Sequence, residues 1–228
     1  MTTATFVRSA TRLCPVPNVP EISLQQADDI YALWERTERE LGKGELPPPF
    51  WAFAWPGGRA LARYLIDHPA TVTGRSVLDI GSGSGLVAIA AARAGAATVS
   101  ASEPDPLARA AMALNAAAND VPPPLCVTAE SEAAAAAEVV LAGDVWYERE
   151  MADSVMTYLE RAAAAGASVF AGDIGRRYFP HTRFDRLASY ELEASFDLEG
   201  KPILTASVWR LNPAGPPVSG PGGPAASA

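Results

Sequence analysis

The sequence predicts an α/β protein with a mostly parallel β-sheet covered by helices on both faces. Short apolar runs typical of strands alternate with helical segments between Ser76 and Ala171, and repeated βαβ units of this kind build parallel sheets. Two longer strand-like segments, Tyr190–Phe196 and Ile203–Leu211, are separated by turn residues, which predicts an antiparallel hairpin at one edge. The chain has 228 residues, 49% of them hydrophobic, and can form one sizeable core.

The chain before this pattern is less regular. The first twelve residues are interpreted as a frayed terminus. Residues 23–42 are predicted to form a helix with Ser23 as its N-cap, because apolar residues recur near one face. Three prolines, Pro47–Pro49, end any preceding helix, and a short helix is predicted at about Arg59–Asp67.

Turn residues divide the alternating part of the chain into elements. The predicted strands are Ser76–Ile80, Thr98–Ser102, Leu125–Ala129, Glu138–Ala142, Ala167–Ala171, Tyr190–Phe196 and Ile203–Leu211. The predicted helices between them are Leu86 to about Ala94, Pro106–Asn119 and Arg149–Ala165.

The composition changes along the chain and suggests three regions. Residues 1–45 are expected to form an N-terminal extension with a helix, and residues 46–211 the principal domain. Residues 212–228 are almost all Pro, Gly, Ala and Ser, so we expect a disordered tail. No apolar run approaches the roughly 20 residues that a membrane span needs, and we therefore expect no membrane association.

The charge and the cysteine content limit the possible partners. A net charge of −8 argues against nucleic acid, because phosphate binding depends on clustered Lys and Arg. The same charge is compatible with a basic protein substrate. Cys14, Cys126, His68 and His181 form no metal-type cluster, so no metal is expected. We expect a monomer in a reducing compartment, either the bacterial cytoplasm or, in a eukaryote, the mitochondrial matrix.

The most informative segment is a strand that runs into a glycine-rich turn, which reads Asp79-Ile80-Gly81-Ser82-Gly83-Ser84-Gly85. Such a turn lets a ligand approach the backbone closely. In the dinucleotide fingerprint G-x-G-x-x-G the third glycine comes one residue later, and a carboxylate at Asp79 would repel a pyrophosphate. A ligand with positive charge and no phosphate fits better. S-adenosylmethionine, with its sulfonium and α-ammonium groups, is such a ligand.

A second acid follows at a spacing that suits a ribose. Glu103 ends the second predicted strand, 24 residues after Asp79 (103 − 79 = 24). This is close to the spacing at which an acid accepts hydrogen bonds from a ribose in nucleotide-binding βαβ units. Glu103 is therefore a candidate for both ribose hydroxyls of an adenosyl group.

The glycine turn and Glu103 together resemble motif I and the acid after the second strand of class I S-adenosylmethionine-dependent methyltransferases. The resemblance extends over about residues 45–211. It implies a Rossmann-like seven-stranded sheet in the order 3-2-1-4-5-7-6, with strand 7 antiparallel. It also implies that Glu130 and Ser131 are the candidates for the adenine contact. The donor-binding residues it implies are Asp79, Gly81, Gly83, Gly85 and Glu103.

The segment after the fourth predicted strand bears on the substrate. It reads Asp144-Val145-Trp146-Tyr147, whereas class I enzymes that methylate amide or nucleobase nitrogens carry Asn-Pro-Pro-Tyr there. It resembles the Asp/Glu-x-x-Tyr/Phe motif of family 16 methyltransferases, which are largely protein-lysine methyltransferases. The resemblance implies that Asp144 borders the donor and orients the amine, and that Tyr147 meets the lysine. An aromatic face accepts a cationic amine, although Trp146 is equally consistent with core packing.

Two further stretches resemble one group within that family. Pro49–Gly58, rich in aromatic residues, and Gly172-Asp173-Ile174-Gly175-Arg176 resemble segments of the enzymes that methylate lysines of the electron transfer flavoprotein β subunit. Proline is expected where this chain has Ile174. The resemblance implies that Trp55 and Gly57 line the donor pocket. It further implies protein-lysine N-methylation, with the flavoprotein β subunit as the partner.

Three alternatives remain open at this point. A small-molecule N- or O-methyltransferase would share every donor residue. An NAD-binding oxidoreductase is disfavoured by Asp79 and by the early third glycine. A non-catalytic module on the same fold would bind the donor, or nothing, without turnover.

Overall fold

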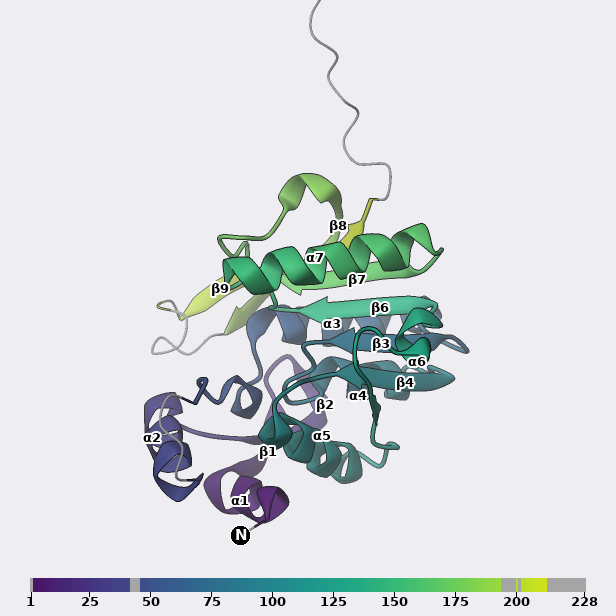
Figure 1. The fold of residues 1–228 in the computed structure, drawn as a ribbon. Coiled ribbons are helices and arrows are strands. Elements are labelled where there is room, and N and C mark those ends of the chain that lie inside the picture. Colours follow the sequence, from purple (N-terminus) through teal and green to yellow (C-terminus); the bar gives the residue numbers. More distant parts are fainter. Residues whose placement is uncertain (1, 42–45, 194–199, 201, 213–228) are drawn as a thin grey trace, which may run out of the picture.

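The computed structural model describes residues 2–41, 46–193, 200 and 202–212 (Figure 1). Beyond Asn212, the tail that the sequence predicts to be disordered lies outside the described residues. Within the described ranges, every helix is too short or too polar to cross a membrane.

Seven strands form one sheet in the order β5-β4-β3-β6-β7-β9-β8. The pairs among β3 to β7 are parallel, whereas β9 is antiparallel to both β7 and β8. Numbered from the first strand of the sheet, this is the order 3-2-1-4-5-7-6, so the predicted topology is confirmed. The strands are β3 (Ser76–Ile80), β4 (Thr98–Ser102), β5 (Leu125–Cys126), β6 (Val139–Gly143), β7 (Ser168–Asp173), β8 (Phe184–Glu193) and β9 (Ile203–Leu211).

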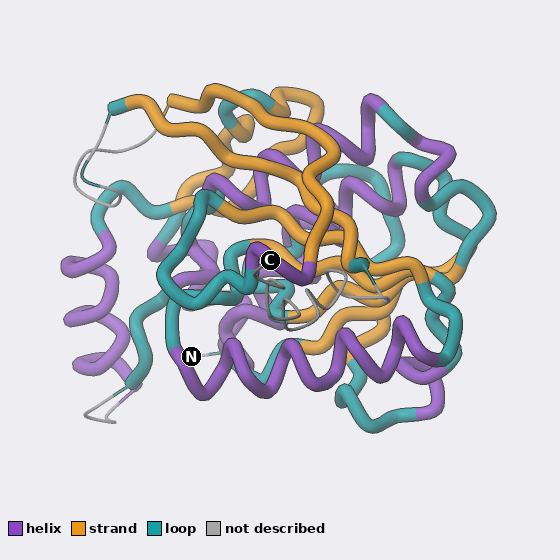
Figure 2. Tube along the Cα trace, turned by 90° about the horizontal axis from the view of Figure 1, so that it is seen from above, coloured by secondary structure: helices purple, strands orange, loops and turns teal. Residues whose placement is uncertain are grey.

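Helices cover both faces of the sheet, as predicted (Figure 2). Successive side chains of a strand point to opposite faces. Val77 and Leu141 therefore pack under α3 and α4, whereas Leu78 and Val140 pack under α7. The helices of this part are α3 (Pro56–Asp67), α4 (Leu86–Arg93), α5 (Pro106–Ala118), α6 (Glu132–Ala135) and α7 (Arg149–Ala164). Short 3-10 turns lie at Phe50–Ala52, Pro69–Thr71 and His181–Arg183.

The first residues form a helix, α1 (Thr3–Ala10), where the sequence predicts a frayed terminus. Thr2 caps it, because its hydroxyl oxygen accepts from the Thr5 N–H at 3.2 Å. Phe6 and Val7 are buried in a cluster that also includes residues of α5. The prediction of a frayed terminus is therefore wrong. Two apolar residues are enough to hold α1 in place, because α5 supplies the surface that buries them.

Residues 12–26 form an antiparallel hairpin of β1 (Arg12–Val16) and β2 (Val19–Gln26). The last four residues of this hairpin fall within the range 23–42 that the sequence predicts to be helical. Ser23 is a strand residue and not an N-cap, and α2 (Ile30–Leu41) begins later. Ile22 and Leu24 are both buried, which is the two-residue alternation of a strand. The missed signal is the Pro17-Asn18 turn, in which Asn18 takes a φ of 68°.

The other differences are small. β8 begins earlier than predicted, at Phe184, and β5 is shorter than the predicted Leu125–Ala129. The last three residues of the predicted strand Tyr190–Phe196 lie outside the described residues.

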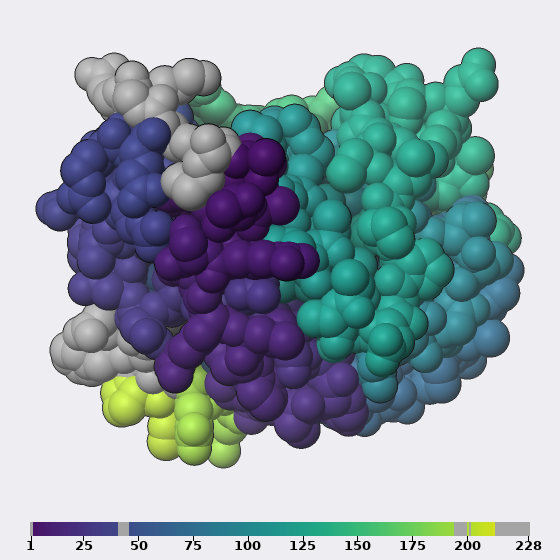
Figure 3. All heavy atoms as spheres, turned by 90° about the horizontal axis from the view of Figure 1, so that it is seen from below, coloured from purple at the N-terminus to yellow at the C-terminus, as the bar shows by residue number. Residues whose placement is uncertain are grey.

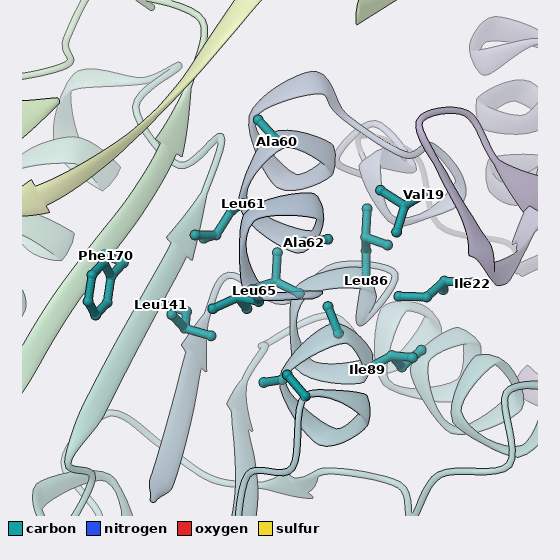
Figure 4. Packing of buried hydrophobic residues seen from close by; sticks show 14 of the residues in the cluster. Val19, Ile22, Ala60, Leu61, Ala62, Leu65, Leu86, Ile89, Leu141 and Phe170 are labelled. Carbon is teal, nitrogen blue, oxygen red and sulfur yellow. The ribbon is translucent and has the colours of Figure 1, made fainter. Parts of the chain in front are cut away.

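The N-terminal hairpin shares a hydrophobic core with the principal sheet. Val19 and Ile22 of β2 lie beside Leu86 and Ile89 of α4 (Figure 4). On the underside of the molecule, the N-terminal segment lies against α5, in the teal part of the chain (Figure 3). Residues 12–26 are thus built into the same core as the sheet.

Candidate active site

A pocket of about 590 Å³ opens at the carboxyl ends of β3, β4 and β6. Gly81, Glu103 and Asp144, which directly follow these strands, line it. The chain order of the sheet reverses here, because β4 and β6 lie on opposite sides of β3. Open α/β sheets bind ligands at this position, and the volume suits a small molecule.

The glycine turn forms one wall of the pocket. Gly81 donates its N–H to the carbonyl of Ser102 at 2.9 Å, which ties the turn to the end of β4. Gly83 has a φ of 49°, a left-handed conformation that favours glycine. Its N–H donates to Oε2 of Glu103 at 2.9 Å. The glycine turn and Glu103, which lies 20 residues after Gly83, are therefore parts of one structure.

Asp79 is buried at the base of this wall, with 1% of its surface exposed. Burial raises the pKa of Asp79 to about 7, against the opposing effect of a hydrogen bond from the Ser82 hydroxyl. The nearby Glu103 raises this pKa further. An acid in this condition ionises readily when a cation arrives beside it.

Glu103 is held by the backbone on both of its oxygens. Oε1 accepts from the Asp105 N–H and Oε2 from the Gly83 N–H, both at 2.9 Å. Burial raises the pKa of Glu103, and these two hydrogen bonds oppose that effect. A carboxylate oxygen has more than one acceptor position, so Glu103 can also accept from a pair of hydroxyls in the pocket.

Gly57 and Gly172 allow α3 to approach the end of β7. A Cβ atom on Gly57 would lie 2.4 Å from the Gly172 carbonyl oxygen and 2.6 Å from Oδ2 of Asp144. A Cβ atom on Gly172 would lie 2.0 Å from the Gly57 carbonyl oxygen. Any side chain at either position would separate the helix from the sheet, so these glycines are needed for close packing.

Asp144 links the first turn of α3 to the loop after β7. Its Oδ2 accepts from the Gly58 N–H at 2.9 Å, and its Oδ1 accepts from Nε of Arg176 at 3.0 Å. Burial raises the pKa of Asp144, and the Arg176 guanidinium is the main opposing influence. Asp144 is 7% exposed and also has a φ of 56°, which is unusual for a residue other than glycine. Such strain occurs often at functional sites.

The segment after β7 aims Arg176 at Asp144. Oδ1 of Asp173 accepts from the N–H groups of Gly175 and Arg176, at 2.6 and 2.7 Å, and fixes a tight turn. Gly175 lies in this turn with a φ of 85°. The Gly-Asp-x-Gly-Arg pattern therefore has a structural explanation here, and Ile174 replaces the expected proline without loss of the turn.

Aromatic rings form the outer part of the pocket. Phe50 contacts Tyr147 and Trp55 edge to face, with ring centroids 5.2 and 5.6 Å apart. The Arg176 guanidinium lies 5.7 Å from the Trp55 ring centroid. Trp146 is fully buried against Phe179, so its role is core packing. Within the Asp-x-x-Tyr motif, Asp144 and Tyr147 face the pocket while Trp146 faces the core.

The structure brings most of the predicted site residues together. The predicted residues that line the pocket are Trp55, Asp79, Gly81, Gly83, Glu103, Asp144 and Tyr147. Gly57 packs against Gly172, and a Cβ atom on Gly85 would lie 2.7 Å from Cγ of Met112, so both act behind the pocket wall. Ser131 caps α6 through the Ala134 N–H, and neither it nor Glu130 is among the lining residues.

Met151 and Arg176 also line the pocket, although the sequence assigns them no role of their own. The available signal was their position shortly after β6 and β7, since the carboxyl ends of parallel strands meet at one edge of the sheet.

Comparison with known proteins supports a common origin. Residues 63–172 match the family model of ribosomal protein L11 methyltransferase (PrmA). The electron transfer flavoprotein beta subunit lysine methyltransferase of Danio rerio is 36% identical over 203 residues, which cover 85% of this chain and 76% of that protein. Its Xenopus laevis counterpart is 36% identical over 219 residues, or 91% of this chain and 86% of that protein. The chain belongs to this lysine methyltransferase family.

Solved structures agree on the fold. An RNA methyltransferase candidate of Pyrococcus horikoshii is 15% identical, with a TM-score of 0.53 over 77% of this chain and 96% of that one. A Thermoplasma acidophilum protein is also 15% identical, with a TM-score of 0.50 over 67% of this chain and 88% of that one.

As a member of this methyltransferase family, the enzyme uses S-adenosylmethionine as its methyl donor. The pocket fits that molecule in size and in charge. The buried Asp79 suits the cationic end of such a ligand, and the partly buried Glu103 suits its two ribose hydroxyls. Membership of this family excludes the oxidoreductase alternative.

Proposed function

We propose that this enzyme transfers a methyl group from S-adenosylmethionine to lysine side chains of the electron transfer flavoprotein β subunit. The proposal rests on one observation: the same pocket has the glycine turn and Glu103 on one wall and the rings of Phe50, Trp55 and Tyr147 at its rim. A rim of aromatic rings suits an aliphatic stem with a cationic end. The two relatives described above are named for methylation of lysine in this flavoprotein subunit.

On the donor side, each residue has a separate task. We propose that Glu103 accepts hydrogen bonds from the ribose hydroxyls and that Asp79 faces the α-ammonium group. Gly81 and Gly83 leave the backbone accessible, and Trp55 covers the methionine part. Gly57 and Gly85 act indirectly, by the close packing that keeps α3 and the glycine turn in place.

On the acceptor side, Asp144 and Tyr147 orient the target amine. When bound, the donor supplies an electrophilic methyl group on its sulfonium sulfur. The residues of this chain must hold the uncharged amine in line with the methyl–sulfur bond, and orientation of this kind accounts for much of the acceleration. The lysine ammonium must first lose a proton to solvent, which frees the nitrogen lone pair. The new nitrogen–carbon bond would then form as the carbon–sulfur bond breaks, and the positive charge would pass from the sulfur to the methylated nitrogen.

Donor affinity is expected to depend on pH through Asp79. The folded pKa of about 7 lies above the ordinary value of 3.8, so the ligand-free protein keeps Asp79 protonated below pH 7. A cationic ligand favours the ionised form, and its affinity should fall as the pH is lowered from about 8 to about 6, by at most about tenfold per unit. Calorimetry with S-adenosylhomocysteine measures this, and proton release appears as a dependence of the heat on the buffer.

Asp79→Asn is the control for this prediction. The amide keeps the shape and cannot ionise, so the variant should bind more weakly and lose the pH dependence over the same range. If the unmodified protein binds equally well at both ends of the range, Asp79 is not the titrating group.

The substrate assignment is tested by intact-mass measurement. Purified enzyme, donor and flavoprotein are mixed, and the β subunit should gain mass in steps of one methyl group. A β subunit whose modified lysines are replaced by arginine should gain none. If the β subunit stays unmodified while a labelled donor marks another protein or a metabolite in the lysate, the methyltransferase activity stands and this substrate is wrong.

We further propose a monomer that works in a reducing compartment, the bacterial cytoplasm or the mitochondrial matrix. Two free cysteines and a net charge of −8 support this setting. The negative charge would assist encounter with a basic lysine-bearing surface and disfavour nucleic acid.

A further inference from the structure

One edge of β2 pairs with β1, and its other edge lies on α5. Every second N–H of β2 points away from β1, as in any antiparallel pair. On that side, the Ser23 N–H donates to Oδ1 of Asn119 at 2.9 Å, and the Gln25 N–H donates to Oδ1 of Asn115 at 2.7 Å. Two asparagine side chains therefore stand where a neighbouring strand would supply carbonyl groups.

The spacing explains why a helix can do this. Asn115 lies in the last turn of α5 and Asn119, its C-cap residue, follows four positions later, a rise of about 6 Å. Alternate residues of a strand are about 6.6–6.8 Å apart, which is nearly the same distance. Asn115 is 0% exposed and Asn119 is 6% exposed, so neither amide has water as an alternative partner.

The two asparagines differ in their second hydrogen bond. Nδ2 of Asn119 donates to the carbonyls of Ser23 and Asn115, both at 2.7 Å, so its bonds stay within β2 and the end of α5. Nδ2 of Asn115 donates instead to the Ser84 carbonyl at 2.8 Å. Ser84 belongs to the glycine turn and lines the pocket. Asn115 alone of this pair joins the N-terminal hairpin to the wall of the donor pocket.

Ser84 needs such an anchor because of its neighbours. Gly83 and Gly85 both have positive φ, at 49° and 81°, and glycine loses more conformational freedom on ordering than any other residue. A turn flanked in this way can populate other conformations. When only a fraction of the molecules holds the binding conformation, the apparent affinity falls by that fraction.

We propose that Asn115 is a positioning residue of the donor site, which holds the glycine turn in its binding conformation by tying the Ser84 carbonyl to β2. Residues 12–26 thereby become part of the donor site, although β1 and β2 contribute nothing to the pocket lining. Because coupling between two sites is reciprocal, donor binding must also stabilise the docking of the hairpin. The inference rests on the proposed donor-binding role of the glycine turn.

A matched pair of substitutions tests it. Asn115→Asp and Asn119→Asp each keep the oxygen that accepts from β2, and each replaces the Nδ2 donor by an oxygen. The new oxygen faces the Ser84 carbonyl in Asn115→Asp and the carbonyls of Ser23 and Asn115 in Asn119→Asp. Both variants should melt at a lower temperature. Asn115→Asp should weaken S-adenosylhomocysteine binding about tenfold at a temperature where it is folded, whereas Asn119→Asp should remain within about twofold of the unmodified protein.

Hydrogen exchange on the unmodified protein gives a second test that needs no variant. The two amides to compare are those of Gln25, bonded to Asn115, and Ser23, bonded to Asn119. Saturating S-adenosylhomocysteine should slow exchange at Gln25 more than at Ser23. Equal protection, or equal loss of affinity in the two aspartate variants, would overturn the inference. Failure of the unmodified protein to bind S-adenosylhomocysteine would instead overturn the proposed function.

Discussion

Replacement of Glu103 by alanine is expected to weaken S-adenosylhomocysteine binding by about 100-fold, which corresponds to about 2.8 kcal/mol. Two effects combine. The variant loses charged hydrogen bonds to the ribose hydroxyls, each contributing about 1.5–3 kcal/mol, and it releases the N–H of Gly83 in the glycine turn. Titration calorimetry on the purified variant measures the loss.

Asp105→Ala is the matched control. Asp105 also lines the pocket, but its carboxylate caps α5 by accepting from the Leu107 N–H at 2.8 Å. Its removal should cost about 1 kcal/mol of stability and leave donor affinity within a few-fold of normal. Undiminished affinity in Glu103→Ala, or an equal loss in both variants, would show that Glu103 does not hold the ribose.

Asp144→Ala is expected to abolish measurable methyl transfer and to lower the free energy of unfolding by on the order of 3 kcal/mol. The Asp144 carboxylate accepts hydrogen bonds from the Gly58 N–H and from the Arg176 guanidinium, and Asp144 is 7% exposed. Its loss therefore disturbs both the start of α3 and a buried ion pair. Asp144→Asn keeps the shape with a smaller cost and should still lose most turnover. The measurements are kcat and KM for the protein substrate, S-adenosylhomocysteine affinity, and the melting temperature.

Asp173→Asn provides the comparison for Asp144. Asp173 is an equally buried acid whose pKa burial raises to about 6, and its Oδ1 caps the turn that carries Arg176. An asparagine oxygen can accept the same two bonds, so turnover should stay near normal. If Asp144→Asn turns over as fast as Asp173→Asn, Asp144 anchors α3 and does not orient the amine.

Most of the sheet could be predicted because its signals are local. β3, β4 and β9 have the predicted bounds, since short apolar runs bounded by turn residues have few alternative structures. The strand order came from the family resemblance and not from these runs. The N-terminal hairpin could not be predicted as easily. The free backbone N–H groups of β2 find their hydrogen-bond acceptors in Asn115 and Asn119, about ninety positions away.

The sequence by itself determined which acids and glycines meet at the edge of the sheet where we propose that the donor binds. Asp79, Gly81, Gly83 and Glu103 lie at or shortly after the carboxyl ends of β3 and β4, and parallel strands bring these ends to one edge whatever the packing around them. Only the tertiary structure decided how the proposed acceptor side is built. Asp144 sits between α3 and Arg176 because Gly57 and Gly172 let two backbones meet, and the asparagine bridge to Ser84 depends on how β2 lies on α5. Such contacts join residues that are distant in the chain, and no local pattern encodes the distance between them.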